Sequence, residues 1–503
     1  MRILIGFAGI RTVGRYDSTR GYYVNQAVQD EFGNWWVSKT GQKTAQADNP
    51  NTAPLPTIVN GEQTPSEHWQ LGIDMQTGVT IPASQAIADC QAATAAAVAA
   101  AAHAEANAQV ITGQIGEIAA KVTNELQTLQ LASFGIRWNI DDAVKTITVV
   151  GNTTLYNKFK TWVEISGKPC EIKKDFTNFA YLRNEAGVAS NVNWTERADG
   201  TGSHYATEDK NDYLQLVELQ NINVAPFINL LDRTMTVYFN LDSVCPNGFY
   251  RWFKNGTKCM GRYDLTFNED NTTLDCAAGN SQPTGNFSAN SIHSMTVATN
   301  ANLLNWTAWE IIVFGWLEVA YYGTFDVATA RGGQMNSGSE SAARNWVAGT
   351  TDTLVAACGA VGGGHRFMYC ENAIDGKQLL WGAGFKYKAN GKAVMTMDDA
   401  KANAAVVITD ANAEITIDFL QVDAAGWVYP KNVDFFGMAS EAGGSSSTGL
   451  TDGQYLTPSC ANNVFYAGGT STNGAVCGVF SRTAYFSASD ARWDPRGRCA
   501  LNR

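Results

Sequence analysis

The chain of 503 residues is poor in charge and in long apolar runs. Charged residues make up 17% of it, below the usual quarter of a soluble protein. Its net charge of −11 argues against a nucleic-acid partner, which requires clustered lysine and arginine. The longest uncharged apolar run, 92–102, is about half of the roughly 20 residues that a membrane span requires. Since the apolar N-terminal run also lacks the length and the cleavage site of a secretory signal, we expect a soluble protein with no membrane insertion.

Closely spaced ligands for metals or disulfides are scarce as well. The 10 cysteines include no CxxC pair, which favours buried thiols in a protein made in a reducing cytoplasm. The 5 histidines lie in separate segments without HxH or HxxxH spacing. The acidic segment 264–275 lacks the glycine and the terminal glutamate of a calcium loop, and we interpret it as a solvated turn. We therefore expect no metal site and no cofactor.

A catalytic site would need residues that the sequence does not pair. Glycan hydrolysis requires two carboxylates that face each other across a cleft. The chain has several candidate carboxylates, but none is paired by spacing: Glu67, Asp209, Asp212, Glu218, Glu318, Asp326, Glu371 and Asp375. We expect a protein that is not an enzyme, and a polysaccharide-cleaving enzyme stays as an alternative.

Residues 1–80 are predicted to form a small β module. Gly21–Val24 and Asn34–Ser38 are short runs of aromatic and β-branched residues, separated by a turn signal at 30–34. So small a module must bury its aromatic side chains to fold, so Trp35, Trp36 and Trp69 are predicted to be core residues.

Residues 84–131 are rich in alanine and glutamine and contain no proline. Apolar and small residues repeat there at alternating spacings of three and four, which is the heptad pattern of a coiled coil. Isoleucine at both core positions favours three or four strands, so the pattern predicts an α-helical coiled-coil stalk, either trimeric or tetrameric. Its trimerisation residues would be Ile87, Ile111, Ile115, Ile118, Val122 and Leu129. An amphipathic helix packed on its own chain is the alternative.

After residue 131 the apolar period changes to that of strands. Val144–Asn152 and Thr234–Leu241 alternate as strands do, and residues 134–300 are predicted to be the β-rich first part of a head. Leu303–Tyr322 has helical spacing, with an aromatic stripe that we assign to the core. Residues 301–503 complete the head and end in a loop-rich part. The fold class predicted for the whole chain is multidomain α+β.

The end of the chain alternates small residues, aromatics and polar residues in a short, turn-rich β pattern. The segments that show it are Gly443–Ser447, Tyr455, Gly468–Thr470, Asn473–Ala475, Gly478–Phe480 and Trp493–Arg498. Together with 305–335 and 367–387, in this order, they resemble the C-type-lectin-fold domains at the tips of bacteriophage tail proteins, including those diversified by retroelements. The resemblance implies a C-type-lectin-like α+β head over 301–503 that binds a receptor.

In that family, fixed scaffold residues alternate with variable contact residues. The resemblance places the scaffold at Gly468, Gly469, Gly474, Ala475, Gly478, Val479, Phe480, Ser487, Ser489, Trp493, Gly497 and Arg498. It places the receptor-binding contacts at Tyr466, Thr470, Ser471, Ser481, Arg482, Tyr485, Phe486, Asp490, Arg492 and Asp494. The family usually has asparagine where this chain has Asp490, Arg492 and Asp494.

The resemblance and the heptad pattern together predict a homotrimeric phage fibre protein in the virion, made in the host bacterial cytoplasm. Residues 1–80 would attach it to other virion proteins, and the head would bind a bacterial surface glycan or protein in host adsorption. A structural head or collar fibre that contacts other virion proteins is the main alternative.

Overall fold

The computed structural model describes short segments before residue 131 and most of the chain after it. The described residues are 11–15, 26–29, 35–38, 58–59, 62–63, 69–73, 94–109, 112, 131–184, 192–204, 211–254, 256–267, 272–276, 286–330, 366–371, 379–445, 450, 452–470 and 477–502. The chain divides into two compact units, Met1–Ala120 and Lys121–Arg503.

Unit 1 contains a four-stranded sheet in the order β1-β2-β3-β6. Its strands are β1 (Arg11–Arg15), β2 (Gln26–Gln29), β3 (Trp35–Ser38) and β6 (Trp69–Ile73). A hairpin of β4 (Ile58–Val59) and β5 (Glu62–Gln63) accompanies it. The strand predicted from the aromatic run at 34–38 is thus confirmed.

The prediction of a coiled-coil stalk over 84–131 is wrong. In that segment the structure describes one helical stretch, 94–109, with residues 112 and 131 also helical, and all these side chains are exposed. None of the helices in the described part of the chain is long enough for such a stalk. Alanine offers little apolar area to a seam, and Gly113 and Gly116 each weaken a helix by about 1 kcal/mol. The predicted trimerisation residues Ile87, Ile111, Ile115, Ile118, Val122 and Leu129 lie outside the described residues.

The predicted fold class, multidomain α+β with a C-type-lectin-like head, is corrected by the same observations. Of the residues that the structure describes, 36% lie in strands and 24% in helices, and the helices are short. The part of the chain that the structure describes is therefore mostly β-sheet. Several of the described strands have only two residues, because turn residues interrupt the apolar runs at short intervals.

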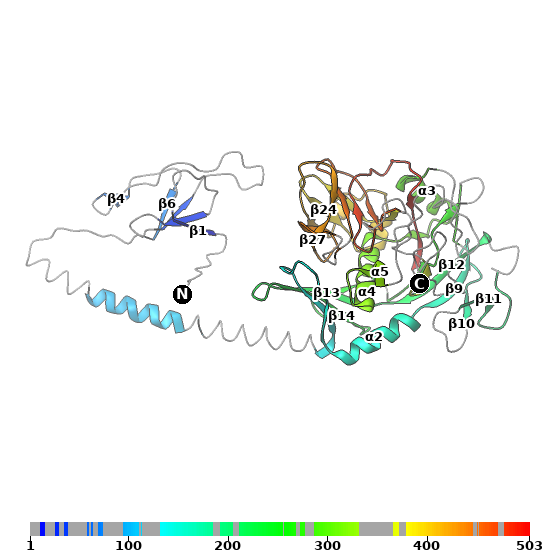
Figure 1. Cartoon of the computed structure of the whole chain (residues 1–503), viewed down its shortest axis with the longest axis horizontal. Helices are drawn as coiled ribbons and strands as arrows, with labels where there is room; N and C mark the ends of the chain where they lie inside the picture. Colours follow the sequence, from blue (N-terminus) through cyan, green and yellow to red (C-terminus); the bar gives the residue numbers. More distant parts are fainter. Residues whose placement is uncertain are drawn as a thin grey trace, which may run out of the picture. The chain divides into compact units, whose positions relative to one another are not determined.

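Unit 2 begins with a five-stranded antiparallel sheet in the order β15-β13-β14-β7-β8 (Figure 1). Its strands are β7 (Phe134–Asn139), β8 (Thr148–Gly151), β13 (Asn223–Asn229), β14 (Thr234–Asn240) and β15 (Tyr250–Arg251). Helix α2 (Thr153–Ile165) starts at the N-cap Asn152 and buries Phe159 and Val163. The Phe159 ring lies 4.9 Å from that of Phe134, which fixes α2 to this sheet.

A seven-stranded antiparallel sheet follows, in the order β11-β10-β9-β12-β16-β33-β19. Its strands are β9 (Lys168–Lys173), β10 (Ala180–Asn184), β11 (Val192–Arg197), β12 (Tyr213–Gln220), β16 (Thr257–Gly261), β19 (Leu304–Asn305) and β33 (Cys499–Asn502). The last strand of the chain, β33, thus pairs with β16 and β19. The two parts of the head, 134–300 and 301–503, share this sheet.

Helix α4 (Ala308–Tyr322) lies at the centre of unit 2 (Figure 1). It begins with a capping box in which Thr307 and Glu310 satisfy each other's backbone N–H groups, and ends at Gly323, whose φ is 70°. Both of its tryptophans, Trp309 and Trp316, are buried, so the predicted helix with an aromatic core stripe is confirmed. Further helices in the described part of unit 2 are α3 (Ala289–Thr299), α5 (Val327–Ala330), α7 (Asp399–Asn403) and the 3₁₀ turn η3 (Asp410–Asn412).

The last large sheet has six strands in the order β26-β29-β31-β30-β22-β32. They are β22 (Leu379–Gly382), β26 (Gly426–Val428), β29 (Gln454–Leu456), β30 (Phe465–Ala467), β31 (Arg482–Thr483) and β32 (Pro495–Arg496). A three-stranded sheet is formed by β23 (Phe385–Lys388), β24 (Lys392–Met395) and β25 (Ile415–Asp418). Three two-stranded sheets are formed by β27 (Pro430–Val433) with β28 (Ala439–Ala442), by β17 (Thr266–Phe267) with β18 (Leu274–Asp275), and by β20 (Arg366–Phe367) with β21 (Cys370–Glu371).

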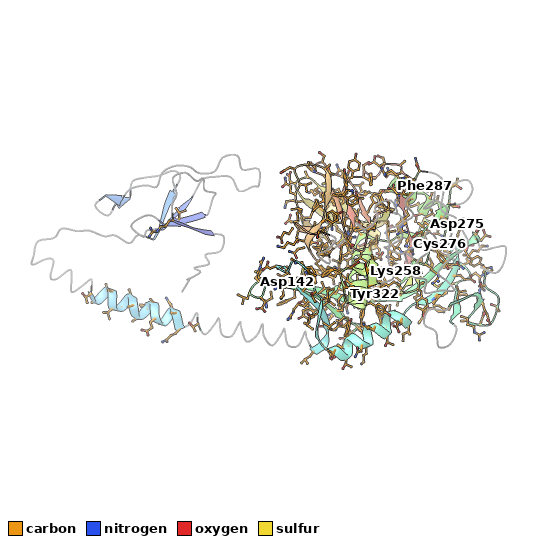
Figure 2. All side chains as sticks on the ribbon, viewed as in Figure 1. Asp142, Lys258, Asp275, Cys276, Phe287 and Tyr322 are labelled. Carbon is orange, nitrogen blue, oxygen red and sulfur yellow. The ribbon has the colours of Figure 1, made fainter. Side chains whose placement is uncertain are left out.

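Buried charges join distant parts of unit 2. The carboxylate of Asp264 lies 2.5 Å from Nη1 of Arg496 and 2.7 Å from Nη2 of Arg498, and all three side chains are buried. Asp264 and Asp275, the two ends of the acidic segment 264–275, are therefore buried and do not belong to a solvated turn, while residues 268–271 lie outside the described residues. Lys258 forms a second buried group with Glu310 and Asp399, and Figure 2 shows it among the packed side chains of this unit.

The described cysteines are free thiols, and all but Cys245 are fully buried, as the sequence predicts. Among the described residues no helix is both long and apolar enough to cross a membrane.

Candidate binding pocket

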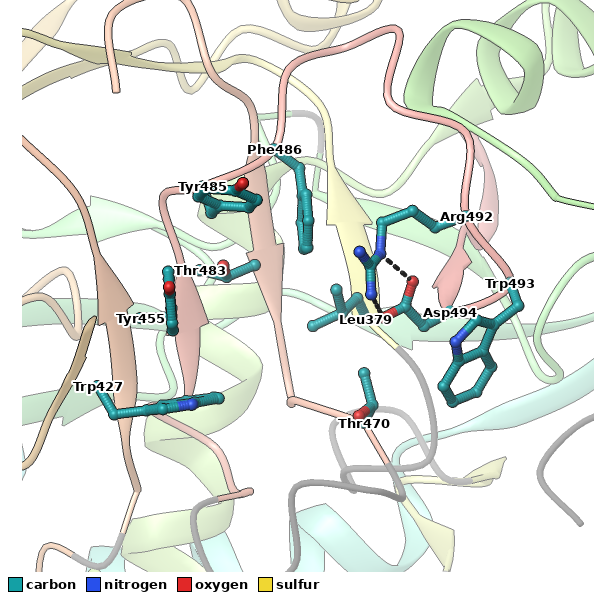
Figure 3. A pocket seen from close by; sticks show the side chains of 10 residues that line it. All are labelled: Leu379, Trp427, Tyr455, Thr470, Thr483, Tyr485, Phe486, Arg492, Trp493 and Asp494. Carbon is teal, nitrogen blue, oxygen red and sulfur yellow. Dashed lines mark hydrogen bonds and ion pairs between the residues drawn. The ribbon is translucent and has the colours of Figure 1, made fainter. Parts of the chain in front are cut away.

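A pocket of about 390 Å³ opens on the six-stranded sheet. Its walls come from four strands of that sheet, from Thr470 and from the segment between residues 485 and 494 (Figure 3). The lining residues are Leu379, Trp427, Tyr455, Thr470, Thr483, Tyr485, Phe486, Arg492, Trp493 and Asp494.

The strand register places the aromatic floor of the pocket. Trp427 of β26 lies directly opposite Tyr455 of β29, and Tyr455 is the register partner of Thr483 in β31. Register partners share one face of a sheet, so these three side chains project to the same side. The row continues through Tyr466 of β30 to Trp381 of β22, but both of these residues are buried. Along this row, the face of the sheet is therefore open to solvent only at the end where Trp427 lies.

Four aromatic rings form a continuous chain along the pocket. Trp427 packs edge-to-face on Tyr455 with ring centroids 5.5 Å apart, and Tyr455 packs in the same way on Tyr485 at 5.5 Å. Tyr485 then contacts Phe486 at 5.2 Å. Such contacts hold each ring in one orientation and are worth about 0.5–1.5 kcal/mol each. Trp427 and Tyr485 are nevertheless 41% and 51% exposed, so their free surfaces face solvent at the pocket.

The opposite end of the pocket holds one ion pair. Nε and Nη2 of Arg492 donate to the two carboxylate oxygens of Asp494 at 2.8 and 3.2 Å (Figure 3). The guanidinium carbon also lies 4.4 Å from the ring centroid of Phe486. The hydrogen bond to Asp494 raises the pKa of Arg492, so the guanidinium stays charged. Its side chain is 41% exposed, whereas that of Asp494 is 3% exposed.

Backbone hydrogen bonds fix the segment that carries this pair. Arg492 exchanges two backbone hydrogen bonds with Phe287, at 2.7 and 2.9 Å. The N–H of Leu379 donates to the carbonyl oxygen of Asp494 at 2.8 Å. Arg492 and Asp494 are thus anchored on both sides, to the entry of α3 and to β22.

The predicted contact residues divide into two groups. Thr470, Tyr485, Phe486, Arg492 and Asp494 line the pocket together. Tyr466, Ser481 and Arg482 are buried beneath it and do not line it, while the exposed Asp490 lies outside the lining and accepts a hydrogen bond from the N–H of Ser487. Ser471 lies outside the described residues.

Arg482 and Ser481 hold the fold at this place. Nη1 of Arg482 donates to the carbonyl oxygens of Val479 and Ser481 at 2.8 and 2.9 Å, and its guanidinium lies over the ring of Phe465. The hydroxyl of Ser481 donates to the carbonyl oxygen of Gly453. Burial lowers the pKa of Arg482 to about 10. These side chains stabilise the sheet under the pocket.

Sequence reasoning missed four of the lining residues as contacts: Leu379, Trp427, Tyr455 and Thr483. Trp493, assigned to the scaffold, also lines the pocket. Trp427 lies about 40 positions before Tyr466, the first residue at which a contact was expected. The only signal in the sequence is a large aromatic between small and turn residues, AAGWVYP, and its place beside Tyr455 follows only from the strand register.

Two of the carboxylates considered for hydrolysis have other contacts. Glu218 accepts from the hydroxyl of Tyr181 at 2.9 Å, and Asp326 accepts from the N–H of Thr329 at 3.0 Å. Asp494 is the one carboxylate among the residues that line the pocket, and Arg492 takes both of its oxygens. In the described part of the chain no group of three or more His, Cys, Asp or Glu side chains could hold a metal ion.

A scan against protein-family models found no match for the chain, and a search of curated proteins found no similar sequence.

Proposed function

We propose that this chain is a non-catalytic bacteriophage fibre protein whose pocket binds a receptor on the bacterial surface. The observation that carries the proposal is that one pocket combines the exposed rings of Trp427 and Tyr485 with the anchored pair of Arg492 and Asp494 at its other end. Tryptophan, tyrosine and arginine are the residue types that contribute most to binding, and here they are held rigid before any ligand arrives. A rigid site loses little conformational entropy on binding.

The sequence resemblance to phage tail tips supports the class of partner. It favours a virion location, attachment through residues 1–80 and self-association in a homotrimer. A trimer would multiply a weak single-site affinity by avidity, often about 10²-fold or more when the geometry permits. A pocket of this modest size needs such multiplication to hold a virion on a cell.

Binding of the fluorescently labelled full chain to cells of the bacterium that the virus infects tests this proposal. The wild type should bind and should compete with virion adsorption. The double variant Tyr485→Ala plus Arg492→Ala should lose most of both effects. Val244→Ala plus Arg183→Ala is the matched control, because both residues are exposed and lie outside the pocket.

A structural head or collar fibre is the second candidate. The turn between β13 and β14 exposes Leu230 by 72% and Leu231 by 95%, and Ile228 beside them is 55% exposed. Adjacent exposed aliphatic residues favour contact with another protein. A folded wild type that neither binds cells nor competes with the virion would support this candidate and overturn the first.

A further inference from the structure

We propose that the pocket takes a neutral saccharide, with a sugar ring against the exposed aromatic surface of Trp427 or Tyr485 and adjacent hydroxyls on the outer edge of Arg492. This inference rests on the proposed function and narrows its ligand to one chemical class.

The first step concerns the donors of Arg492. A guanidinium has five N–H groups in a rigid, planar fork. Two hydrogen bonds go to Asp494, and in the described part of the chain the guanidinium of Arg492 has no other hydrogen-bond acceptor. The remaining N–H groups, on a side chain that is 41% exposed, are directed to the pocket and to solvent. Their planar spacing suits two neighbouring oxygen acceptors, such as adjacent hydroxyls of a sugar.

The second step concerns the aromatic surface. The edge-to-face contacts with Tyr455 use part of Trp427 and of Tyr485 and leave much of each ring uncovered. An aromatic face carries partial negative charge, and the C–H groups on one face of a pyranose carry partial positive charge. A flat sugar ring therefore matches these surfaces. A flexible aliphatic chain would bind the same surface but would leave the fork of Arg492 without an acceptor.

The third step concerns charge. The ten lining residues include one cation, Arg492, and one carboxylate, Asp494, so their charges cancel. Asp490 lies close enough to contribute to the raised pKa of Arg492, which adds a negative charge at the rim. A carboxylated or phosphorylated ligand would meet no net positive charge and would compete with Asp494 for the guanidinium. The balance favours an uncharged ligand.

The fourth step concerns size. A pocket of about 390 Å³ is at the lower end of the range, roughly 300–1,000 Å³, that holds small ligands. A stable protein–protein interface needs about 800 Å² on each partner. One or two sugar units at the end of a surface polysaccharide would fill a pocket of this size, whereas a protein partner would need a larger contact area.

Chemical treatment of the cells separates a saccharide from a protein receptor. Periodate cleaves the bond between carbons that bear adjacent hydroxyls, so periodate-treated cells should lose binding of the labelled full chain, whereas protease-treated cells should keep it. Binding should also be inhibited by neutral methyl glycosides of common hexoses more strongly than by the methyl glycoside of glucuronic acid. It should be insensitive to ionic strength, because no net charge attracts the ligand.

Two variants test the roles of the residues. Arg492→Lys keeps the positive charge but removes the planar fork, and should weaken inhibition by the best methyl glycoside about tenfold. Arg183→Lys, the same exchange at an exposed arginine outside the pocket, should leave it unchanged. Trp427→Phe should retain more affinity than Trp427→Ala, because a smaller ring still offers a face.

The opposite results would overturn the inference and leave the proposed function intact. Binding that survives periodate and is lost after protease treatment would make the receptor a protein. Stronger inhibition by the glucuronic acid glycoside, falling with added salt, would make the pocket an anion site. Absence of any cell binding by a folded wild type is a different outcome, since it would contradict the proposed function itself.

Discussion

The guanidinium carbon of Arg492 lies 4.4 Å from the ring centroid of Phe486, and this contact fixes the polar end of the pocket. The ring supports one face of the guanidinium while Asp494 takes one edge. A long, flexible side chain is thereby held in one orientation, with its remaining donors directed to the opening. Removal of either support should therefore change which ligands the pocket binds.

Asp494→Asn should weaken the preference of the pocket for neutral over carboxylated glycosides. The substitution keeps the size of the side chain but leaves the charge of Arg492 without its partner. We expect weaker binding of neutral methyl glycosides, because the fork loses its fixed orientation, and stronger binding of the carboxylated glycoside. Stability should fall by about 1 kcal/mol, since the arginine is partly exposed. Inhibition of cell binding by both glycosides and urea denaturation measure the two effects, and an unchanged preference would contradict the role of the pair.

Tyr466→Phe should leave binding unchanged. Tyr466 was predicted to be a contact, but its side chain is 0% exposed and lies under Phe486, with ring centroids 6.1 Å apart. Removal of its hydroxyl does not alter the open surface. Inhibition constants of the methyl glycosides should match those of the wild type, and a loss comparable to that of Trp427→Ala would show that the ligand reaches deeper than the pocket described.

Gly382→Ala should destabilise unit 2. A Cβ at this position of β22 would lie 2.8 Å from Cα of Ala308 and 2.8 Å from Cδ1 of Phe465, so α4 would be pushed from the sheet. We expect a loss of about 1–3 kcal/mol in the free energy of unfolding. Gly426→Ala is the matched control, because nothing lies within 4 Å of its Cβ and the change should stay within about 0.5 kcal/mol. Urea denaturation compares the two.

Asp264→Asn should be among the most destabilising single substitutions. Asp264 forms ion pairs with two buried arginines, Arg496 and Arg498, which belong to the last segment of the chain. Loss of this carboxylate charge beside two buried cations should cost about 3–5 kcal/mol. The exposed pair of Lys392 and Asp418 provides the control, and Asp418→Asn should change stability by less than about 1 kcal/mol. Equal effects of the two substitutions would contradict the role assigned to Asp264.

Glu310→Gln should remove one component of the pH dependence of stability. Lys258 faces two buried carboxylates, Glu310 and Asp399, and burial raises the pKa of Glu310 to about 7. The folded protein therefore holds this proton more tightly than the unfolded chain, whose glutamate titrates near pH 4.5. The free energy of unfolding should fall as the pH rises through this window and become constant above it. The free energy of unfolding of the variant, measured by urea denaturation across the same pH range, should not show this fall. Parallel curves of stability against pH for the variant and the wild type would show that Glu310 is not the source of the fall.

Local patterns in the sequence determined several elements of this protein. The helical spacing of Leu303–Tyr322 and the alternation in Thr234–Leu241 correspond to α4 and β14, because each depends on residues that are neighbours along the chain. The scarcity of paired cysteines correctly predicted buried free thiols. The heptad spacing in 84–131 led to the wrong prediction of a coiled coil, because a repeat of small side chains satisfies the pattern without supplying apolar area to bury.

The composition of the pocket was decided by tertiary structure alone. Trp427 meets Tyr455 because β26 pairs with β29 in one register, and a shift by one residue would turn Trp427 to the other face. Tyrosine and arginine are common at binding surfaces, but Tyr466 and Arg482 are buried here. Their burial depends on the segment 485–494 and on the packing of Phe465, which no local pattern reveals. The sequence by itself determined which residues could form strands, a capped helix and a polar, aromatic-rich end. Which of those aromatic side chains face solvent depends on strand pairing between positions far apart in the chain.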